Sequence, residues 1–390
     1  MKFSPITDRL SSLGSEKWAV HIEGRQRAAK GEQLIFLSIG EPDLPPAPAL
    51  LEHARQEIKP SNLHYSPSRG EALLLQSLSR HYTRQTGRPI SPLQFLYLPG
   101  TQTALYLAFL SILEHGDQVL VLDPYYATYE AVITSPGGVP VPVPLDPDRG
   151  FHIDFAALQK AVTPRTRAIL LNSPSNPTGA VFTEAEIKSV GEFAIAHDLW
   201  IVSDEVYASI VHDNNVFTSP FFFNELEGRT IVVSSISKSH GVPGFRSGWI
   251  AASEEYCARV LPVAETMLFG SQAFLEKTLA FALDNDFAET ASTRLAYVSR
   301  ARSLIKVFAG CNKLNAHMPE GGMFVMVDVR QTGLSGIEFA RRLLAEHGVV
   351  TMPGESFGKQ GAGHLRVALT VDENQMAEAA RRMVMLANSV

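Results

Sequence analysis

The sequence predicts an α/β fold built on a mostly parallel sheet that helices cover on both faces. Short apolar runs rich in β-branched residues, which are typical of buried strands, recur through the middle of the chain. Helical patterns separate several of these runs, and such alternation indicates parallel strands joined by crossover helices. The seven runs span residues 95–98, 118–122, 139–143, 167–171, 199–203, 230–234 and 248–252.

Length and composition narrow the class of protein. The chain has 390 residues and a net charge of −6, with charges of both signs dispersed along it. No basic segment is present that would bind nucleic acid or an anionic membrane, and no apolar run approaches the length of a membrane span. Two distant cysteines, Cys257 and Cys311, form no metal or redox motif, which favours a reduced, cytoplasmic setting.

The N-terminal part is expected to lie apart from the large sheet. An irregular arm is predicted for residues 1–14, followed by a helix at 15–30 and a strand at 34–39. The proline-rich stretch 40–46 cannot continue a regular element, so we expect a segment boundary there.

A second, smaller unit is predicted from the C-terminal pattern. Helices are expected at 102–114, at 183–197 behind a capping box of Thr183 and Glu186, and through most of 254–309. Three parts follow: an N-terminal arm (1–14), a large domain (48–289), and a small α+β domain (15–47 and 290–390). The C-terminal elements of the small domain are strands at 323–329, 349–352 and 364–369, and helices at 336–346 and 373–387.

The segment 234–249 carries the main chemical signal. Lys238 follows an apolar strand, where an amine is well placed to attack a carbonyl carbon. Ser235, Ser237 and Arg246 supply hydroxyl and guanidinium donors that suit a phosphate. A lysine for an aldehyde beside donors for a phosphate is the requirement of pyridoxal 5'-phosphate (PLP). Taken alone, the segment is equally consistent with surface side chains beside a glycine-rich turn.

Two turns after other strands offer further polar groups. The Gly100-Thr101-Gln102 turn opens a helix whose first N–H groups and dipole would bind a phosphate. Pro177 holds Asn176 in a loop that would present its amide to the phenolic oxygen of the cofactor. An ordinary turn and a plain loop are the respective alternatives.

A carboxylate stands at the end of the fifth run. Asp204 leaves a nearly wholly apolar strand, so it needs a partner, and a pyridinium N–H is one such partner. Tyr207, three residues on, would hold the same phenolic oxygen as Asn176. A helix N-cap by Asp204 is the alternative.

Two more residues suit a small-molecule site. Tyr126 lies in an aromatic cluster after the second run and would stack on a flat ring, although core packing is equally consistent. Arg366 is a lone cation within a predicted strand and suits bidentate binding of a substrate carboxylate, with a surface arginine as the alternative.

The joint placement of these residues favours one binding site. Gly100, Tyr126, Asn176, Asp204 and Lys238 each follow the carboxyl end of an apolar run. In an open parallel sheet that edge is where ligands bind. The sequence therefore predicts a PLP site along this edge.

Other chemistries find less support. Residues 354–358 (G-E-S-F-G) match the nucleophile elbow of serine hydrolases around Ser356, yet a loop and not a helix is predicted after it. No G-x-G-x-x-G motif follows an early strand, as a nicotinamide-binding domain would need. The histidines form no H-E-x-x-H motif, so metal chemistry is not indicated.

With these residues the chain resembles the fold-type I, class I and II PLP-dependent aminotransferases over essentially its full length. The resemblance implies an aspartate aminotransferase-like fold and a Schiff base between Lys238 and PLP. It further implies that Asp204 pairs with the pyridine nitrogen, that Tyr126 stacks on the ring, and that Asn176 and Tyr207 hold the ring oxygen. The phosphate would be bound by Ser235, Ser237, Arg246, Gly100, Thr101 and Gln102.

The resemblance extends to the substrate and to a second subunit. Arg366, Asn176 and the backbone of Gly40 match the residues that bind the substrate α-carboxylate. Tyr65 resembles the tyrosine that reaches the phosphate in the neighbouring subunit, which implies a homodimer. The sheet of the family has seven strands, one of them antiparallel, and the run at 248–252 would supply that strand.

Within the family, the stretches 163–167, 196–200 and 321–328 look most like the arginine:pyruvate transaminase branch. We therefore expect a ping-pong transfer of an amino group from an L-amino acid to a 2-oxo acid such as pyruvate. The donor would be arginine or another basic or neutral amino acid. The alternatives are an aspartate- or aromatic-type aminotransferase, a PLP-dependent lyase or oxidase on the same scaffold, and a non-catalytic PLP-binding module.

Overall fold

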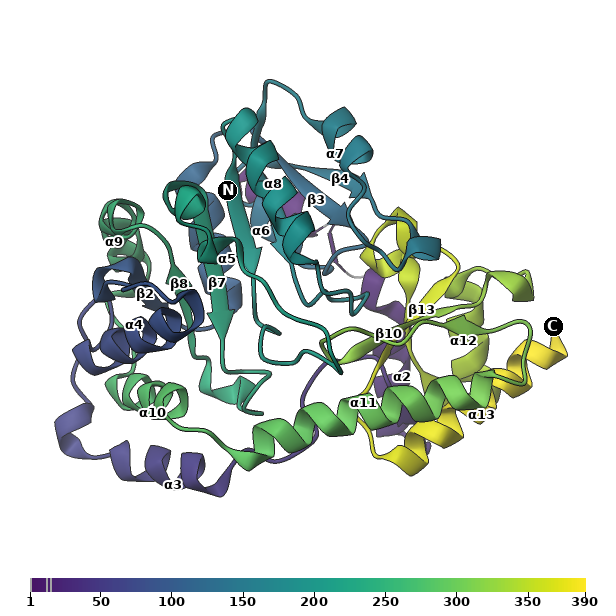
Figure 1. Cartoon of the computed structure of the whole chain (residues 1–390). Helices are drawn as coiled ribbons and strands as arrows, with labels where there is room; N and C mark the ends of the chain where they lie inside the picture. The colour runs from purple at the N-terminus through teal and green to yellow at the C-terminus, as the bar shows by residue number, and fades with distance from the viewer. Residues whose placement is uncertain (1, 12, 15) are drawn as a thin grey trace.

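The computed structural model describes residues 2–11, 13–14 and 16–390. Its largest element is a seven-stranded sheet with the order β2-β8-β7-β6-β5-β3-β4 (Figure 1). β8 pairs antiparallel with β2 and β7, and the other pairings are parallel, so the predicted sheet and its antiparallel strand are confirmed. The strands are β2 (Phe95–Leu98), β3 (Gln118–Asp123), β4 (Val139–Pro144), β5 (Thr166–Asn172), β6 (Trp200–Asp204), β7 (Thr230–Ser235) and β8 (Gly248–Ala251).

Helices cover both faces of this sheet. Val119 and Val121 of β3 belong to a core shared with α5 (Thr101–Ile112) and α9 (Glu254–Leu268), whereas Leu120 belongs to a core shared with α8. Successive side chains of a strand point to opposite faces, so an almost wholly apolar strand requires cover on both sides. The other helices of this part are α3 (Pro48–Glu57), α4 (Ala72–Thr86), α6 (Tyr129–Thr134), α7 (Phe155–Ala161), α8 (Glu184–Ala196, with its capping box) and α10 (Ala273–Asp284).

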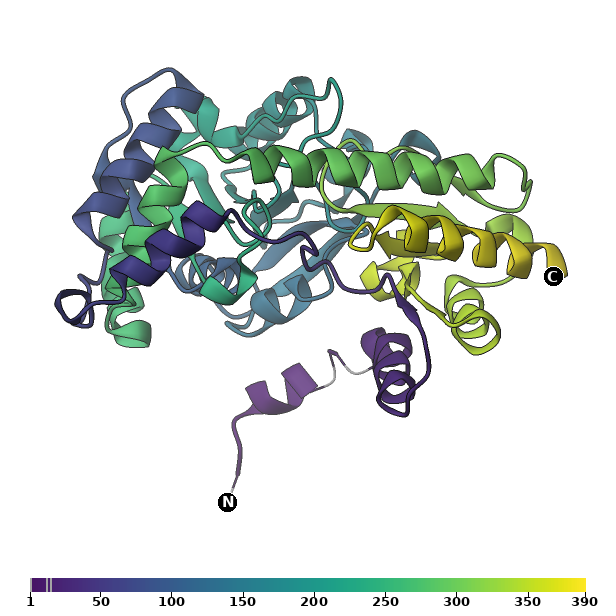
Figure 2. The ribbon, with the colours of Figure 1, turned by 90° about the horizontal axis from the view of Figure 1, so that it is seen from below.

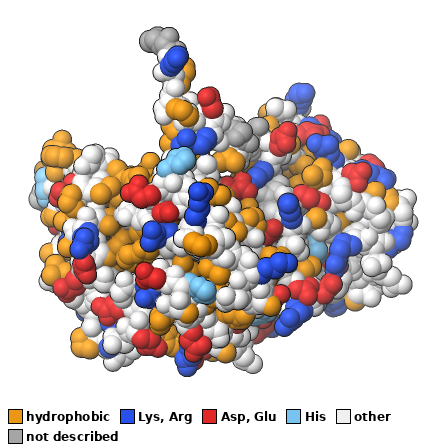
Figure 3. Space-filling view, turned by 90° about the horizontal axis from the view of Figure 1, so that it is seen from above, with side chains coloured by type: hydrophobic (Ala, Val, Ile, Leu, Met, Phe, Trp, Pro, Cys, Tyr) orange, Lys and Arg blue, Asp and Glu red, His pale blue; other side chains and the backbone are white. Residues whose placement is uncertain are grey.

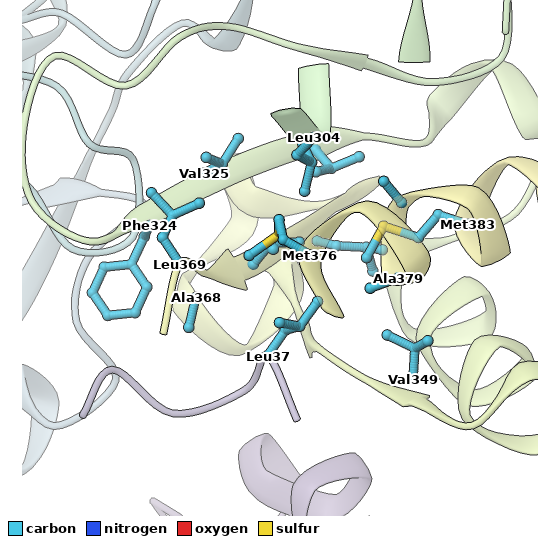
Figure 4. Close-up of a cluster of buried hydrophobic side chains, with 14 of the residues drawn as sticks. Leu37, Leu304, Phe324, Val325, Val349, Ala368, Leu369, Met376, Ala379 and Met383 are labelled. Carbon is cyan, nitrogen blue, oxygen red and sulfur yellow. The ribbon is translucent and has the colours of Figure 1, made fainter. Parts of the chain in front are cut away.

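A second core lies beside the large sheet and combines residues of the N-terminal segment, from Val20 on, with residues of the C-terminal part. Figure 4 shows Leu37, from the N-terminal segment, among side chains of the C-terminal part such as Leu304 and Met376. The long helix α11 crosses residue 290 without a break, and the exact domain limits stay a prediction. The elements here are β1 (Ile35–Phe36), β9 (Asn315–Ala316), β10 (Phe324–Asp328), β11 (Val349–Val350), β12 (Met352–Pro353), β13 (His364–Ala368), α11 (Ala288–Phe308), α12 (Gly336–His347) and α13 (Glu373–Ser389).

The expected strand at 34–39 is shortened for a physical reason. β1 pairs in parallel with β11, and Leu37 N–H then donates to the Val350 carbonyl oxygen. The Leu37 carbonyl oxygen accepts from Ala368 N–H instead, because the chain crosses at this point to the four-stranded sheet β12-β13-β10-β9. The change of partner ends the regular pairing.

The N-terminal arm is helical and not irregular as expected. Helix α1 (Pro5–Ser11) has no buried residue and projects from the body of the molecule (Figures 2 and 3). Met1, Ser12 and Ser15 lie outside the described residues, so the predicted start of the next helix at Ser15 is untested. The described part of that segment forms a 3-10 turn (Glu16–Trp18) followed by α2 (Ala19–Ala29).

Lys and Arg side chains are mixed with Asp and Glu over the face in Figure 3. Of the helices that the structure describes, none combines the length and the apolar character that crossing a membrane requires.

Candidate active site

A cavity of about 230 Å³ lies at the carboxyl edge of the large sheet, where its walls follow the ends of five strands. The structure brings almost all of the predicted site residues together here; Gly100 and Tyr65 are the exceptions that do not line it. The lining residues are Trp18, Ile39, Gly40, Thr101, Gln102, Leu105, Tyr126, Tyr129, Asn172, Asn176, Asp204, Val206, Tyr207, Ser235, Ser237, Lys238, Pro243, Arg246, Phe324 and Arg366.

Lys238 enters the cavity from the loop after β7. Its Nζ donates a hydrogen bond to the Gly40 carbonyl oxygen at 2.6 Å. Burial lowers the pKa of Lys238 to about 8, because loss of water disfavours the ammonium form. Arg366 and Arg246 lower this pKa further and Glu41 opposes them. A lysine amine that is partly neutral near pH 8 can act as a nucleophile and as a base.

Asp204 stands at the floor of the cavity at the end of β6. Its Oδ2 accepts a hydrogen bond from the Tyr129 hydroxyl at 2.7 Å, and its Oδ1 accepts from Val206 N–H at 3.2 Å. Burial raises the pKa of Asp204 to about 6. A turn follows it, so the alternative of a helix N-cap is wrong. A buried carboxylate near neutrality is stabilised by a cationic partner.

Arg366 is buried, which rules out the alternative of a surface arginine. Its guanidinium lies between the rings of Phe324 and Phe357, 4.3 and 4.5 Å from their centroids. Nη1 donates to Asn176 Oδ1 at 3.0 Å and Nη2 donates to the Ser38 carbonyl oxygen. The buried Nε has no partner among the described residues. Burial lowers the pKa of Arg366 to about 10, so it remains a cation at neutral pH.

The opposite end of the cavity gathers anion-binding groups. Gly100 has a φ of +92°, and a Cβ there would overlap the Arg246 guanidinium, so this turn requires glycine. Thr101, the first residue of α5, has a buried hydroxyl oxygen without a partner among the described residues. Ser235 and Ser237 line the same cavity. Hydroxyls, a guanidinium and a helix start form the donor set that a phosphate requires.

Two of the site residues that sequence reasoning missed contact Asp204. Tyr129 donates to Asp204, and Asn172 Nδ2 donates to the Asp204 carbonyl oxygen at 3.0 Å. Asn172 Oδ1 also accepts from Asn176 N–H at 2.8 Å, which fixes the Asn176 loop. Tyr129 belongs to the same aromatic cluster as Tyr126, three residues on, and this was its sequence signal, but its contact with Asp204 was not predicted.

The sequence profile of the family described as aminotransferase class I and II matches residues 32–383. The chain belongs to this family. The aminotransferase is 38% identical over 387 residues to the arginine–pyruvate transaminase AruH of Pseudomonas aeruginosa, covering 99% of this chain and 98% of that protein. It is 30% identical to a probable aspartate/prephenate aminotransferase of Aquifex aeolicus, covering 97% of each.

Solved structures of aminotransferases are similar to this chain, in agreement with the family match. The Thermus thermophilus aspartate aminotransferase with maleate superposes with a TM-score of 0.91 at 28% identity, covering 99% of this chain and 100% of that one. The aromatic aminotransferase of Pyrococcus horikoshii superposes with a TM-score of 0.88 at 28% identity, covering 94% and 99%. The predicted family, the aspartate aminotransferase-like fold and the class of enzyme are therefore confirmed.

Aminotransferases of class I and II use PLP, and the residues of this chain fit that cofactor. The orphaned Thr101 hydroxyl and the exposed Arg246 guanidinium would bind its phosphate. Lys238 offers an amine of lowered pKa to an aldehyde, and buried Asp204 offers a carboxylate to a ring nitrogen. The enzyme is a PLP-dependent transaminase.

The serine-hydrolase motif has a structural role in this aminotransferase. Ser356 lies in a 3-10 turn (Gly354–Phe357) that another 3-10 turn follows, so no nucleophile elbow forms. Its hydroxyl donates to the Lys17 carbonyl oxygen at 2.7 Å. This contact ties the N-terminal segment to the loop that carries Phe357.

Proposed function

We propose that the enzyme moves the amino group of a basic or neutral L-amino acid, with arginine as the first candidate, to a 2-oxo acid such as pyruvate in a ping-pong cycle. The observation that carries the proposal is that Lys238 and Arg366 line the same cavity. A carboxylate held by Arg366 would bring an amino acid to the Lys238 amine.

The residues that line the cavity would divide into three groups. Arg366, Asn176 and the Gly40 backbone would bind the substrate carboxylate, and the unpartnered Nε of Arg366 leaves a donor for it. Asp204, Tyr126, Asn176 and Tyr207 would hold the cofactor ring. The phosphate would be bound by Gly100, Thr101, Gln102, Ser235, Ser237 and Arg246.

PLP, once bound, supplies a positively charged ring that withdraws electrons from the substrate Cα. Asp204 would keep the ring nitrogen protonated, and Tyr129 and Val206 hold its carboxylate in place. Lys238 Nζ would take the proton from Cα. With a pKa of about 8, roughly one tenth of this amine is neutral at pH 7, far more than for a solvated lysine. Proton transfer should therefore quicken as the pH rises towards 8.

The cavity chemistry supports a basic or neutral side chain. Lys238, Arg246 and Arg366 are the cations among the described lining residues, and each has a role above. A second carboxylate, as in aspartate, therefore lacks a further cationic partner among the described lining residues. Trp18 also lines the cavity, and its ring would offer a surface on which a guanidinium or an apolar side chain could stack. The 38% identical arginine–pyruvate transaminase points the same way.

An aspartate- or aromatic-type aminotransferase is the second candidate, favoured by relatives of those names at about 30% identity. Purified holoenzyme mixed in turn with arginine, aspartate, alanine and phenylalanine distinguishes them. The true donor should remove the absorbance of the cofactor aldehyde, and pyruvate should restore it. Ammonia or hydrogen peroxide released without such restoration would instead indicate a lyase or an oxidase.

The Lys238→Ala variant should lose both the yellow absorbance and turnover. The covalent bond to the cofactor needs the Lys238 amine, and so does the proton transfer. Absorbance spectra and activity with the best donor measure this. A variant that keeps wild-type turnover would remove Lys238 from the mechanism, while leaving the choice of substrate open.

The proposal includes a homodimer in which Tyr65 completes the neighbouring site. Tyr65 is 78% exposed and its ring packs edge-on against Phe269, which is 72% exposed, at 5.3 Å. Two large aromatic side chains exposed together are typical of an interface. Mixed dimers of Tyr65→Phe and Lys238→Ala subunits should recover part of the activity, since one site then keeps both residues. No recovery on mixing would count against shared sites.

The proposal also places the enzyme in the cytoplasm. Cys257 and Cys311 are both buried as free thiols, which suits a reducing compartment.

A further inference from the structure

A second cavity lies at the bend between α10 and α11. Its volume is about 480 Å³, roughly twice that of the active-site cavity. The C-terminal end of α4 forms its opposite wall. Figure 1 shows α10 leading through a short connection into the start of α11, below the large sheet. No residue of this cavity has a part in the transamination described above.

Two arginines give the cavity its charge. Arg84, on α4, donates to the Leu283 carbonyl oxygen at 3.2 Å, and Arg294, on α11, donates to the Val211 carbonyl oxygen at 3.3 Å. Within the described chain neither arginine forms an ion pair with a carboxylate. Each guanidinium therefore keeps donors that an anion could accept. Asp286 also lines the cavity, and the two arginines still leave an excess of positive charge.

Histidines and apolar side chains complete the wall. Burial lowers the pKa of His81 and of His240 to about 4, so both rings are neutral at pH 7 and add hydrogen-bonding groups without charge. The His240 ring meets Phe287 edge-on at 5.8 Å, and Leu283 lies nearby on the same wall. A ligand here would meet cations at one part and apolar surface at another.

The cavity shares its wall with the active site. Ser239 and His240 follow Lys238 directly, and their side chains are joined at 2.8 Å. Ile210 lies three residues after Tyr207, and its N–H donates to the Tyr207 carbonyl oxygen at 2.7 Å. The two cavities thus lie on opposite sides of the same two loops.

Helix α11 offers a second route between the cavities. Arg300, six residues after Arg294, donates to both carboxylate oxygens of Asp43 at 2.8 Å. Asp43 lies three residues beyond Gly40, whose carbonyl oxygen accepts from Lys238. Helix α11 therefore connects the wall of this cavity, through Arg300 and Asp43, to the segment whose backbone contacts Lys238.

We propose that this cavity binds a small anion between Arg84 and Arg294, namely a molecule with an apolar body that carries a carboxylate or a phosphate group. Binding of this anion would change the environment of the Lys238 amine. Such a ligand would be an effector and not a substrate, because the loops after Tyr207 and Lys238 separate it from the cofactor site.

The test titrates purified holoenzyme with benzoate and with phenyl phosphate, and follows heat by calorimetry. Benzamide, which has the shape of benzoate without the charge, is the ligand control. The variants are Arg84→Gln, Arg294→Gln and the charge-keeping Arg294→Lys. Arg259→Gln is the matched control, because Arg259 is an exposed arginine on α9 that pairs with Glu255 outside the cavity. Thermal unfolding checks that each variant folds.

Saturable binding of either anion is expected in wild type and in Arg259→Gln. The dissociation constant should rise about tenfold or more in Arg84→Gln and in Arg294→Gln, and less in Arg294→Lys. If benzoate binds more tightly, the natural anion is a carboxylate; if phenyl phosphate binds more tightly, it is a phosphate. Equal binding of benzamide, or equal binding in all variants, overturns the site. Binding that survives in Arg84→Gln and disappears in Arg366→Gln places the anion in the active site and also overturns it.

The coupling has its own measurement. Saturating anion should shift the pH midpoint of the cofactor absorbance, which reports on the bond at Lys238, and should change kcat for whichever amino acid the enzyme accepts. An absorbance titration that is identical with and without saturating anion overturns the effect on Lys238. This readout does not depend on the identity of the substrate.

Discussion

The two ends of the active-site cavity hold their arginines in opposite ways. Arg366 is 2% exposed, lies between two phenylalanine rings, and donates to two protein oxygens. Arg246 is exposed, adopts a left-handed φ of 49°, and donates to the Pro243 carbonyl oxygen. Protein contacts hold the Arg366 guanidinium in place, whereas the Arg246 guanidinium has few protein contacts and keeps donors that a ligand could use.

Under the proposed assignment, this difference would separate the binding of a transient substrate at Arg366 from that of a resident cofactor at Arg246. A carboxylate that arrives and leaves in every cycle gains most from a receptor that needs no rearrangement. A cofactor that stays can itself order the residues around its phosphate. The buried end should therefore govern catalysis and stability, and the exposed end should govern retention of the cofactor.

The largest effect is expected at the buried end. Arg366→Gln should lower kcat/KM about a thousandfold, because two charge-assisted hydrogen bonds to the substrate carboxylate, each roughly 2 kcal/mol, are lost. Steady-state kinetics with the best amino donor measure this, and cofactor binding should be unchanged. A loss of less than tenfold would mean that another group binds the carboxylate.

Asp204→Asn should stabilise the cofactor-free protein while removing activity. Because burial raises the pKa of Asp204 from 3.8 to about 6, the folded state loses stability relative to the unfolded state as pH rises between these values. Above pH 6 the full penalty, about 3 kcal/mol, persists. Urea unfolding of both proteins should show this gain at pH 8 and a smaller one at pH 5. A variant that is less stable at pH 8 would contradict the assignment.

At the exposed end, Arg246→Lys should weaken cofactor binding about tenfold, because an ammonium replaces a planar guanidinium that can bind two phosphate oxygens. Titration of the cofactor-free protein with PLP, followed by absorbance, gives the dissociation constant. With saturating PLP, kcat should fall less than threefold. If kcat falls as far as it does in Arg366→Gln, the contrast between the two ends is lost.

The smallest effect is expected from Tyr129→Phe. The Tyr129 hydroxyl stabilises the ionised form of Asp204, so its removal should raise the Asp204 pKa further. The pH midpoint of the holoenzyme absorbance should shift, and kcat should fall a few-fold. Phe at this position keeps the ring, so an unchanged midpoint would reduce Tyr129 to a packing role.

The order of the strands along the chain and the sheet edge that carries the candidate site could both be predicted from the sequence, because both depend on local patterns. Lys238, Asp204 and Asn176 follow strand ends, and strand ends are visible as the limits of apolar runs. Contacts between distant segments were not predictable in this way. Tyr129 reaches Asp204 across 75 positions, and only the packed structure shows that contact.

The surroundings of Arg366 illustrate the same limit. Phe324 belongs to β10 and Phe357 to a turn after β12. No pattern in the sequence predicts that both rings pack against the Arg366 guanidinium. The helical arm was missed for a different reason. Helix α1 has no buried face, so it lacks the apolar periodicity by which helices are predicted.

Trp18 lines the active-site cavity and packs against the cluster that contains Phe357. The two other tryptophans, Trp200 and Trp249, lie in strands of the large sheet. The indole of Trp18 in the wall of the active-site cavity gives this enzyme an intrinsic fluorophore close to where PLP would bind. Events in the cavity can therefore be followed by light emission, with no label attached and none of the chemistry disturbed.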